Sequence, residues 1–245
     1  MKGYELVFKG MLETLQKIQD TQVDNIKEAA KIVSDTIMND GIIHSFGAGH
    51  SNLLAEEISF RAGTIVPVNH MSDVSVSGTV NVVRSTYTER LEGIGQVIYE
   101  HVNPDPKDAL IVISNSGRNA APVEIAREAQ KKGNKVIALT SVTYSKSQPS
   151  RHPSGKLLLD YADVILDNCG VEGDICATHP DMVQGLAPTS TVAGAFILHS
   201  VMAQAVYNMK DAGYEPPVFM SGNFDGGMEF NQALLDRYWD RMRNW

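Results

Sequence analysis

Residues 109–119, Ala-Leu-Ile-Val-Ile-Ser-Asn-Ser-Gly-Arg-Asn, join a wholly apolar run of five residues to a turn rich in hydroxyl and amide groups. An uninterrupted apolar run of this length predicts a β-strand that is buried on both faces, as in a parallel sheet. A helix is predicted next, at 121–132, with Pro122 near its first turn and Gly133 as its stop signal. A strand, a polar turn and a helix in this order are typical of an α/β protein.

The same pattern recurs along the chain. Further strands are predicted at 42–46, 65–68, 136–139 and 164–166. Helices are predicted at 52–62, at 89–101 and, as a long helix, at about 191–210. Strands that alternate with helices predict an α/β fold built on a doubly wound, five-stranded parallel sheet, with a flavodoxin-like strand order and helices on both faces.

Three regions are expected along the 245 residues, a length that suits one domain with helical additions. Residues 1–40 are expected to form N-terminal helices that pack on a ligand-binding domain at 41–212, and residues 213–245 to form a helical tail. The first N-terminal helix is predicted at 6–18. The hydroxyl of Thr21 is expected to cap the second.

Charge and composition restrict the partners. The formal net charge of −8 opposes sequence-independent attraction to nucleic acid or anionic lipid, so we expect neither nucleic acid nor a membrane as partner. The most apolar long stretch, 192–206, contains His199 and is shorter than the roughly 20 apolar residues of a spanning helix, which predicts a buried helix. Cys169 and Cys176 are the only cysteines, and the start of the sequence does not resemble a secretion signal. We therefore expect a cytoplasmic protein with reduced thiols.

The loop after the first predicted strand suits an anion. This first loop, Phe-Gly-Ala-Gly-His-Ser at 46–51, places Gly47 and Gly49 ahead of Ser51 at the start of a helix. Glycine lets backbone N–H groups approach an anion, and a helix start favours negative charge. Many turns between strands and helices contain glycine, so a structural role for this loop is an equal alternative.

Two nucleotide-binding patterns are absent from the first loop. A dinucleotide-binding loop requires a third glycine and an acidic residue at the end of the next strand, where this chain has Asn52 and Asn69. A nucleotide P-loop requires a Gly-Lys-Ser/Thr sequence, which does not follow. We therefore expect no cofactor.

The turn at 114–119, called the serine turn below, is the more specific indication. Ser114 and Ser116 place two hydroxyls two residues apart, Gly117 adds flexibility and Asn119 adds an amide. A phosphate with no lysine beside it needs such a set of hydrogen-bond donors. The alternative is that these side chains only cap the following helix. In an open parallel sheet both loops lie at the carboxyl ends of the strands, where ligands bind.

At this point a family resemblance becomes specific. The Ser-x-Ser-Gly-x-Asn pattern of the serine turn resembles the phosphosugar-binding turn of sugar-isomerase (SIS) domains, and the first loop resembles the first loop of that family. Pro-Thr-Ser-Thr at 188–191 resembles the turn that completes the sugar-phosphate pocket in several members. The resemblance covers roughly residues 40–210 and implies that 41–212 form an SIS phosphosugar-binding domain. The phosphosugar-binding residues that it implies are Gly47, Gly49, His50, Ser51, Ser114, Asn115, Ser116, Gly117, Asn119, Thr189, Ser190 and Thr191.

Within the family, the pattern is most similar to phosphoheptose isomerase. That resemblance implies that Glu57 and Arg61 face the pocket from one helix and that His199 is the catalytic acid or base. Phosphoheptose isomerase has His and Glu at the positions of Glu57 and Arg61, so we expect no metal site. The alternative interpretation of His199 is a core histidine bonded to a backbone carbonyl.

Two further groups of residues could carry chemistry. His70 and Asp73 follow the second predicted strand on the ligand side, and they are alternative acid–base candidates, with His70 preferred. Asp174, Cys176 and His179 could hold a divalent metal, but their spacing matches no familiar zinc ribbon or finger. A surface loop is the preferred interpretation of this segment.

The resemblance predicts a protein that binds a small-molecule sugar phosphate and catalyses its aldose–ketose isomerisation, with His199 or Glu57 moving a proton through an enediol. One alternative is a lyase that cleaves the lactyl ether of N-acetylmuramic acid 6-phosphate, for which Glu57 is equally suited. Another is a sugar-phosphate sensor without catalysis. SIS domains usually assemble as dimers or tetramers with pockets near subunit interfaces, which implies a homodimer or a homotetramer.

Overall fold

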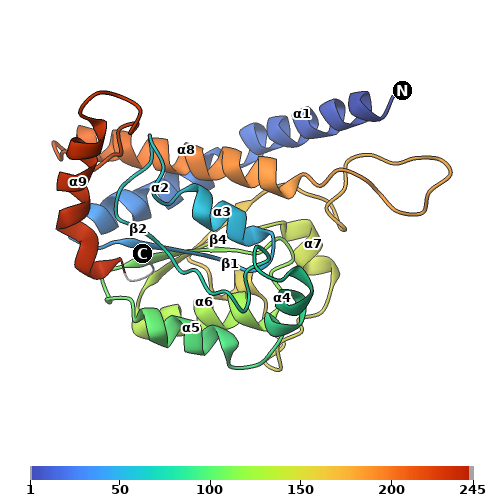
Figure 1. The fold of residues 1–245 in the computed structure, drawn as a ribbon. Helices are drawn as coiled ribbons and strands as arrows, with labels where there is room; N and C mark the ends of the chain where they lie inside the picture. Colours follow the sequence, from blue (N-terminus) through green and yellow to red (C-terminus); the bar gives the residue numbers. More distant parts are fainter. Residues whose placement is uncertain (1, 243–245) are drawn as a thin grey trace.

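Five parallel strands form the sheet at the centre of the computed structural model, which describes residues 2–242 (Figure 1). The strands are β1 (Ile43–Gly47), β2 (Val68–His70), β3 (Ala109–Ile113), β4 (Lys135–Thr140) and β5 (Val164–Asp167). Their order across the sheet is β2-β1-β3-β4-β5, and every neighbouring pair is parallel. This confirms the predicted doubly wound α/β fold and its flavodoxin-like strand order.

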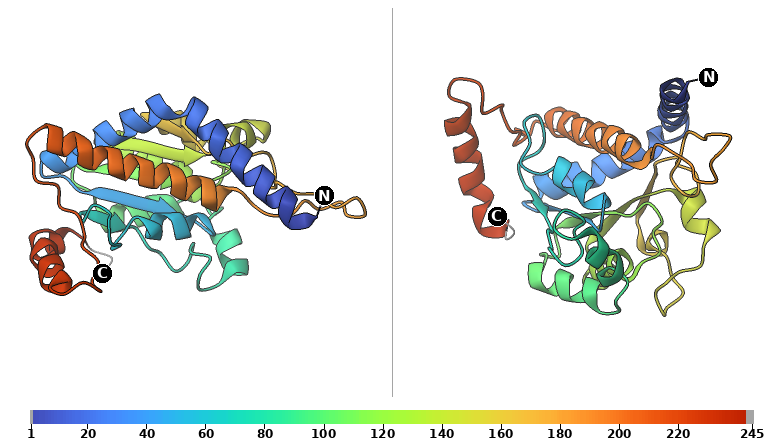
Figure 2. Two further views of the ribbon diagram at one scale, coloured as in Figure 1. Left: turned by 90° about the horizontal axis from the view of Figure 1, so that it is seen from above. Right: turned by 45° about the vertical axis from the view of Figure 1, so that its right-hand side comes forward.

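Helices cover both faces of the sheet. The longer helices are α1 (Gly3–Thr21), α2 (Val23–Met38), α5 (Ile94–Val102), α6 (Ala120–Lys132), α8 (Ser190–Asp211) and α9 (Gly227–Tyr238). The shorter ones are α3 (Ser51–Glu57), α4 (Val82–Thr88), α7 (Val142–Ser147) and the 3-10 helices η1 (Leu158–Tyr161) and η2 (Trp239–Arg241). Figure 2 shows α8 and α2 side by side on one face, and α5 and α6 lie on the other.

Alternation along β3 divides the core into two layers. Ile111 and Ile113 pack in the cluster formed with α2, α3 and α8, whereas Leu110 and Val112 pack in the cluster formed with α5 and α6. Successive residues of a strand point to opposite faces, so an unbroken apolar run is what a strand covered on both faces requires. The central strand thus has the environment that its sequence predicts.

The second strand differs from its prediction at 65–68. The structure pairs only Val68–His70 with β1, because Ile65 and Val66 bond to the tail instead. Ile65 forms an antiparallel bridge with Val218, and the N–H of Val66 donates to the carbonyl of Pro217 over 2.8 Å. The run of apolar residues is therefore shared between two partners.

Two predicted helices have different limits. The helix expected at 89–101 starts at Ile94, after Gly93 with a φ of 90°, and α4 precedes it as a separate helix. The helix expected at 52–62 ends at Glu57. A residue with a left-handed φ does not continue a helix, and here Gly93 supplies that break at the lowest steric cost.

The expected cap at Thr21 is wrong. Thr21 is the last residue of α1, and its hydroxyl donates to the carbonyl of Lys17 over 2.7 Å. Gln22 stands between α1 and α2, and its side chain accepts a hydrogen bond from the N–H of Asp167 in β5 over 3.0 Å. The two helices are therefore nearly continuous, and their junction is held by the sheet rather than by a local cap.

Asp108 joins the amino end of the sheet to the C-terminal tail. One carboxylate oxygen, Oδ2, lies 3.1 Å from Nε2 of His44, and the other, Oδ1, accepts from Nη2 of Arg241 over 2.6 Å. Nη1 of Arg241 also donates to the carbonyl of Asp40 over 2.7 Å. A small apolar cluster that includes Ile42 and Leu235 packs α9 beside this network.

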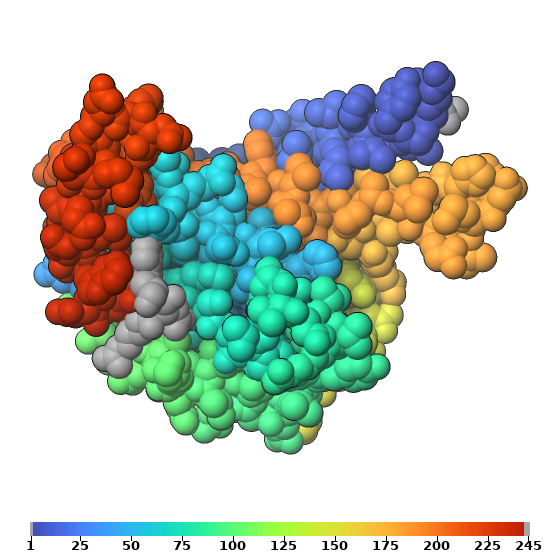
Figure 3. Space-filling view, in the orientation of Figure 1, coloured from blue at the N-terminus to red at the C-terminus, as the bar shows by residue number. Residues whose placement is uncertain are grey.

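Two segments project from one corner of the molecule (Figures 1 and 3). One is the N-terminal half of α1, and the other is the strap, defined as residues 171–188. The two approach closely, because a Cβ on Gly10 would lie 2.6 Å from the Cβ of Cys176. Phe8 and Leu12 of α1 are 63% and 67% exposed, so this extension presents apolar side chains to its surroundings.

Candidate functional site

The first loop, the serine turn and the start of α8 meet around a cavity of about 140 Å³ at the carboxyl ends of the strands. Five of the predicted phosphosugar-binding residues line it: His50, Ser51, Asn115, Ser190 and Thr191. The remaining lining residues are Leu54, Ile113, Leu139, Asn168 and Asp174. Three segments that are far apart in sequence thus contribute to a single cavity, as expected at this edge of an open sheet.

The first loop depends on its glycines. A Cβ on Gly47 would lie 2.3 Å from the carbonyl oxygen of Ser51, and Gly49 has a φ of 57°. Without side chains at these positions the backbone folds back tightly and brings Ser51 to the cavity. The hydroxyl of Ser51 has no hydrogen-bond partner within residues 2–242, so it is available to a ligand.

The serine turn uses one of its two hydroxyls internally. Oγ of Ser114 accepts a hydrogen bond from the N–H of Gly117 over 3.1 Å, which closes the turn. Gly117 has a φ of 60°, and a Cβ there would lie 2.9 Å from Oγ of Ser145. The half-buried Ser116 hydroxyl is not engaged by any residue that the structure describes. Ser116 is therefore the free hydroxyl of the turn.

Asn115 is fixed by its neighbours. Its side-chain oxygen accepts from Nδ2 of Asn168 over 2.8 Å, and its carbonyl accepts from the N–H of Ser141 over 3.0 Å. Asn168 in turn accepts from the N–H of Gly170 over 2.9 Å. The two amides form a preorganised polar wall of the cavity.

Asn119 does not line the cavity. Its side-chain oxygen accepts from Nη1 of Arg151 over 2.9 Å, and its side chain makes no capping bond to α6. Glu89 lies in the same cluster, where burial raises the pKa of its carboxyl against the opposing effects of Asn119, Arg90 and Arg151. The structure therefore places the last residue of the serine turn in a neighbouring cluster of charged groups.

Asp174 is a residue of the site that sequence reasoning did not assign to it. Its Oδ1 accepts from the N–H of Thr189 over 3.0 Å, from Oγ1 of Thr189 over 3.2 Å and from the N–H of Ser190 over 2.9 Å. Its Oδ2 accepts from Oγ of Ser190. An internal carboxylate thus occupies the electropositive start of α8.

The bonds to Asp174 change the expected roles of Thr189 and Ser190. Both were expected to donate to a phosphate, but in this structure their N–H and O–H groups donate to Asp174. The next residue, Thr191, is exposed at the cavity. No sequence signal near the helix start identifies Asp174, since it precedes Ser190 by 16 residues.

Across residues 2–242 there is no group of three or more His, Cys, Asp or Glu side chains that could hold a metal ion.

The two rival catalytic candidates are in contact with each other. Nε2 of His199, on α8, lies 3.0 Å from Oε1 of Glu57 at the end of α3. Nη1 of Arg61 donates to the other oxygen of Glu57 over 3.1 Å. The side chain of His199 is 41% exposed and faces a carboxylate, so the interpretation of a core histidine bonded to a carbonyl is wrong.

The His199–Glu57 pair lies along the two helices that begin at the cavity. Glu57 follows Ser51 on α3, and His199 follows Thr191 on α8 by eight residues, which corresponds to about 12 Å of helix. Neither member lines the cavity of 140 Å³ itself. A ligand that reaches both must therefore extend out of the cavity along α3 and α8.

His70 and Asp73 do not line the cavity of about 140 Å³ at the first loop and the serine turn. Nε2 of His70 lies 2.9 Å from Oδ1 of Asn52, and burial lowers the pKa of the imidazole although the charge of Glu56 acts in the opposite direction. The cavity that His70 lines, with Glu56 and Trp239, is a different one of about 530 Å³. Asp73 accepts from the N–H of Ser75 over 2.7 Å within a turn.

Comparison with known proteins was informative at the level of family and fold. A family model described as SIS domain matches residues 8–141. UPF0309 protein GK1441 from Geobacillus kaustophilus is 42% identical over 235 residues, which cover 96% of this chain and 94% of that protein. A phosphoheptose isomerase from Francisella tularensis has a TM-score of 0.55 at 19% identity, covering 84% of this chain and 98% of that chain.

A second solved structure, phosphoheptose isomerase from Neisseria gonorrhoeae, has a TM-score of 0.51 at 19% identity, covering 84% of this chain and 95% of that chain. At this identity the two structures establish a shared fold. The match in sequence to the family model is independent of them and covers more than half of the chain.

Proposed function

Because this chain belongs to the SIS domain family, we propose that it binds a phosphorylated sugar and catalyses its aldose–ketose isomerisation. The observation that carries the proposal is the contact of 3.0 Å between Nε2 of His199 and Oε1 of Glu57. A histidine beside a carboxylate is suited to general acid–base catalysis, because the carboxylate orients the ring and stabilises its protonated form.

The phosphate would bind at the serine turn. Ser51 lines the cavity with a free hydroxyl, and the free hydroxyl of Ser116 belongs to the residue that follows Asn115, which also lines the cavity. Ser114 keeps its own O–H as a donor while its oxygen closes the turn. Hydroxyl donors compensate for the missing lysine. Binding energy from the unreactive phosphate then holds the reactive carbons in place.

The proton transfer would take place at the His199–Glu57 pair. One of the two groups removes the proton from the carbon α to the carbonyl, the electrons of that C–H bond form the C=C bond of the enediol, and the carbonyl oxygen gains a proton. The same group then returns a proton to the former carbonyl carbon while the hydroxyl on the α carbon loses its proton and becomes the new carbonyl, which converts aldose to ketose without net loss of atoms. The other member of the pair sets the charge and orientation of the first.

The decisive experiment is isomerisation in heavy water, with a panel of sugar phosphates and detection by NMR. An enediol exchanges its proton with solvent, so we expect deuterium on the carbon α to the carbonyl. Release of lactate from N-acetylmuramic acid 6-phosphate would establish the lyase instead. If no sugar phosphate exchanges deuterium while several raise the melting temperature, the protein is a sensor.

The wider context of this function is also a proposal. We propose a cytoplasmic homodimer or homotetramer, without nucleic-acid or membrane partners, divided into regions 1–40, 41–212 and 213–245. Helix α8 has the length and composition of a membrane span, but it packs against α2 and the sheet as a core helix. Its buried side chains, such as Ile197 and Val201, belong to the larger apolar cluster.

A further inference from the structure

Three arginines gather beside the serine turn in a chain whose net charge is −8. Arg118 is part of the turn, and its carbonyl accepts from the N–H of Arg151 over 2.9 Å. Arg151 donates to Asn119 over 2.9 Å, and Arg90 follows α4 next to Glu89 in the same cluster. The cluster is therefore built from three separate segments of the chain.

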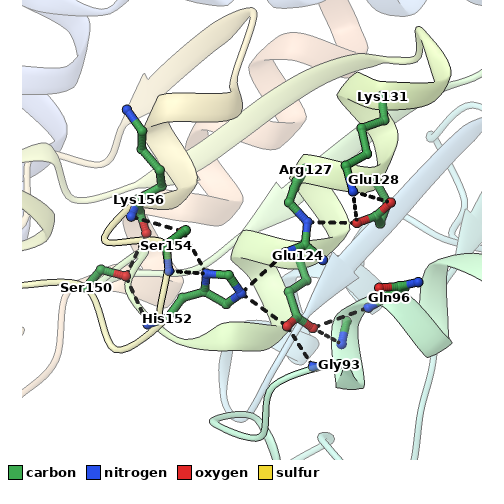
Figure 4. A network of polar contacts seen from close by, with 11 residues as sticks. Gly93, Gln96, Glu124, Arg127, Glu128, Lys131, Ser150, His152, Ser154 and Lys156 are labelled. Atoms are coloured by element: carbon green, nitrogen blue, oxygen red, sulfur yellow. Dashed lines mark hydrogen bonds and ion pairs between the residues drawn. The ribbon is translucent and has the colours of Figure 1, made fainter.

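A single buried carboxylate holds two of these segments (Figure 4). Oε1 of Glu124, on α6, lies 3.3 Å from Nε2 of the buried His152, which follows Arg151. The same carboxylate accepts from the N–H of Gly93 over 2.7 Å and of Gly95 over 2.8 Å. Glu124 thus anchors both the loop that carries Arg151 and the segment after Arg90. A fully buried charge with several hydrogen bonds gives such loops a fixed position.

The positive charge of the cluster is only partly balanced. Burial and then the charges of Arg90 and Arg118 lower the pKa of Arg151, so the guanidinium groups repel one another. Glu89 and Tyr144 act on Arg151 in the opposite direction, and Glu89 is the carboxylate of the two. Glu89 faces the charges of Arg90 and Arg151, and Arg118 adds a further positive charge beside Arg151, which leaves an excess of positive charge.

Donors in the cluster also lack partners. Nε of Arg118 is buried and has no hydrogen-bond partner among residues 2–242, and its Nη1 reaches Oε1 of Gln148 only at 3.5 Å. The start of α6 offers few free backbone donors to an anion. The N–H of Ala121 already donates to the carbonyl of Glu89 over 3.0 Å, and Pro122 has no N–H. An anion at this place would therefore take most of its hydrogen bonds from side chains.

We propose that Arg90, Arg118 and Arg151 form a second anion-binding subsite beside the serine turn, for a sugar phosphate that carries a second anionic group, either a carboxylate or another phosphate. Guanidinium groups bind both through paired, charge-assisted hydrogen bonds. The subsite rests on the proposed function, because the first phosphate would occupy the serine turn. It adds a class of substrate that the turn alone does not select.

The test is calorimetry with three ligands: fructose 6-phosphate, fructose 1,6-bisphosphate and 6-phosphogluconate. The wild type is expected to bind at least one of the two doubly anionic ligands about tenfold more tightly than fructose 6-phosphate. Arg151→Gln should remove most of that preference and leave the affinity for fructose 6-phosphate unchanged. Arg84→Gln, an exposed arginine on α4, is the matched control and should change neither affinity. Which doubly anionic ligand binds better identifies the second group.

Several outcomes would overturn the subsite. Equal wild-type affinities for all three ligands would show that the arginines bind no second anion. An equal loss of all three affinities in Arg151→Gln would show that they hold the first phosphate. Failure of the proposed sugar-phosphate binding is distinguishable, because then fructose 6-phosphate and other sugar phosphates would not bind the wild type at all, and failure of the isomerisation is reported separately by the deuterium exchange. Arg90→Gln provides a second variant at an exposed position.

Discussion

Ser116 carries the free hydroxyl of the serine turn, since Ser114 is engaged with Gly117. Ser116→Ala should weaken sugar-phosphate binding by about 1–3 kcal/mol, because a phosphate oxygen loses a charge-assisted hydrogen bond. Calorimetry measures this loss directly. Ser147→Ala, on the surface at the end of α7, is the control. If both Ser114→Ala and Ser116→Ala bind sugar phosphates like the parent, the phosphate binds elsewhere.

His199 and Glu57 can be separated by their kinetic effects. His199→Gln should lower kcat by roughly 10²–10⁴ with little change in binding, as expected for loss of an acid–base group. Glu57→Gln should have a comparable effect if the two act as a pair, because their 3.0 Å contact is then lost as a charge interaction. Steady-state kinetics and thermal melting distinguish a catalytic role of His199 from a structural one. A lower melting temperature with unchanged kcat would make His199 a structural residue.

Local sequence patterns predicted part of the lining of the cavity. Ser51 and Asn115 follow strands in recognisable loops, and the structure places both at the cavity. The contact between His199 and Glu57 was not predicted, because 142 residues separate them and each was considered as an alternative to the other. Asp174 was missed as a partner of α8 for the same reason: its contacts exist only in the folded chain.

At the scale of the elements, the start of α8 depends on Asp174. Asp174→Ala should lower the free energy of unfolding by about 1–3 kcal/mol, because the donors of Thr189 and Ser190 lose their acceptor. Urea denaturation measures the change. Asp181→Ala, at an exposed position of the strap, is the control. An unchanged stability would mean that water replaces the carboxylate at no cost.

The long elements were predictable and the short ones were not. Strand β3 and helix α6 follow from an apolar run and a helical period with recognisable ends. Helices α4 and α7 have seven and six residues, too few for a clear period of hydrophobicity. Strand β2 lies at Val68–His70 instead of the predicted 65–68 because Ile65 and Val66 pair with the distant tail. No local sequence pattern indicates that pairing.

For the whole molecule, the exposed side of α1 predicts self-association. Phe8 and Leu12 are 63% and 67% exposed on a helix that projects with the strap, an arrangement unusual for a monomer. Light scattering should report at least a dimer. Phe8→Glu should lower the measured mass toward that of a monomer, while Lys9→Glu, at the neighbouring exposed position, should not. A wild-type mass near 26.7 kDa at micromolar concentration would contradict the assembly.

Asp108 predicts a loss of stability in acid. Burial opposes its ionisation, but hydrogen bonds from His44 and from the N–H groups of Ile42 and Asp105, with the charge of His44, outweigh burial and hold the pKa of Asp108 below its ordinary value. The unfolded chain therefore binds this proton at a higher pH than the folded protein. Ionised Asp108 therefore stabilises the folded protein at pH values above the pKa that this carboxyl has in the unfolded chain. That stabilisation is lost as the pH falls through the pKa of Asp108 in the folded protein.

Urea denaturation between about pH 6 and about pH 3 measures this effect. Near the upper end of this pH range, where the charge of Asp108 stabilises the fold, Asp108→Asn should be less stable than the wild type. It should also lose less stability on acidification, because the titrating group is absent. Parallel pH profiles for the two proteins would assign the acid sensitivity to other carboxyl groups.

The link between Arg241 and Asp108 has a consequence for biosynthesis. A chain made from its N-terminus can form the sheet around β1 and β3 well before its last helix has been synthesised. During that interval Asp108 has His44 as a partner but lacks the guanidinium group that bonds its Oδ1 at 2.6 Å. The bond between Arg241 and Asp108 at the amino end of the sheet can form only after residue 241 leaves the ribosome. Nascent chains stalled before that residue should therefore expose the amino end of the sheet to chaperones and proteases.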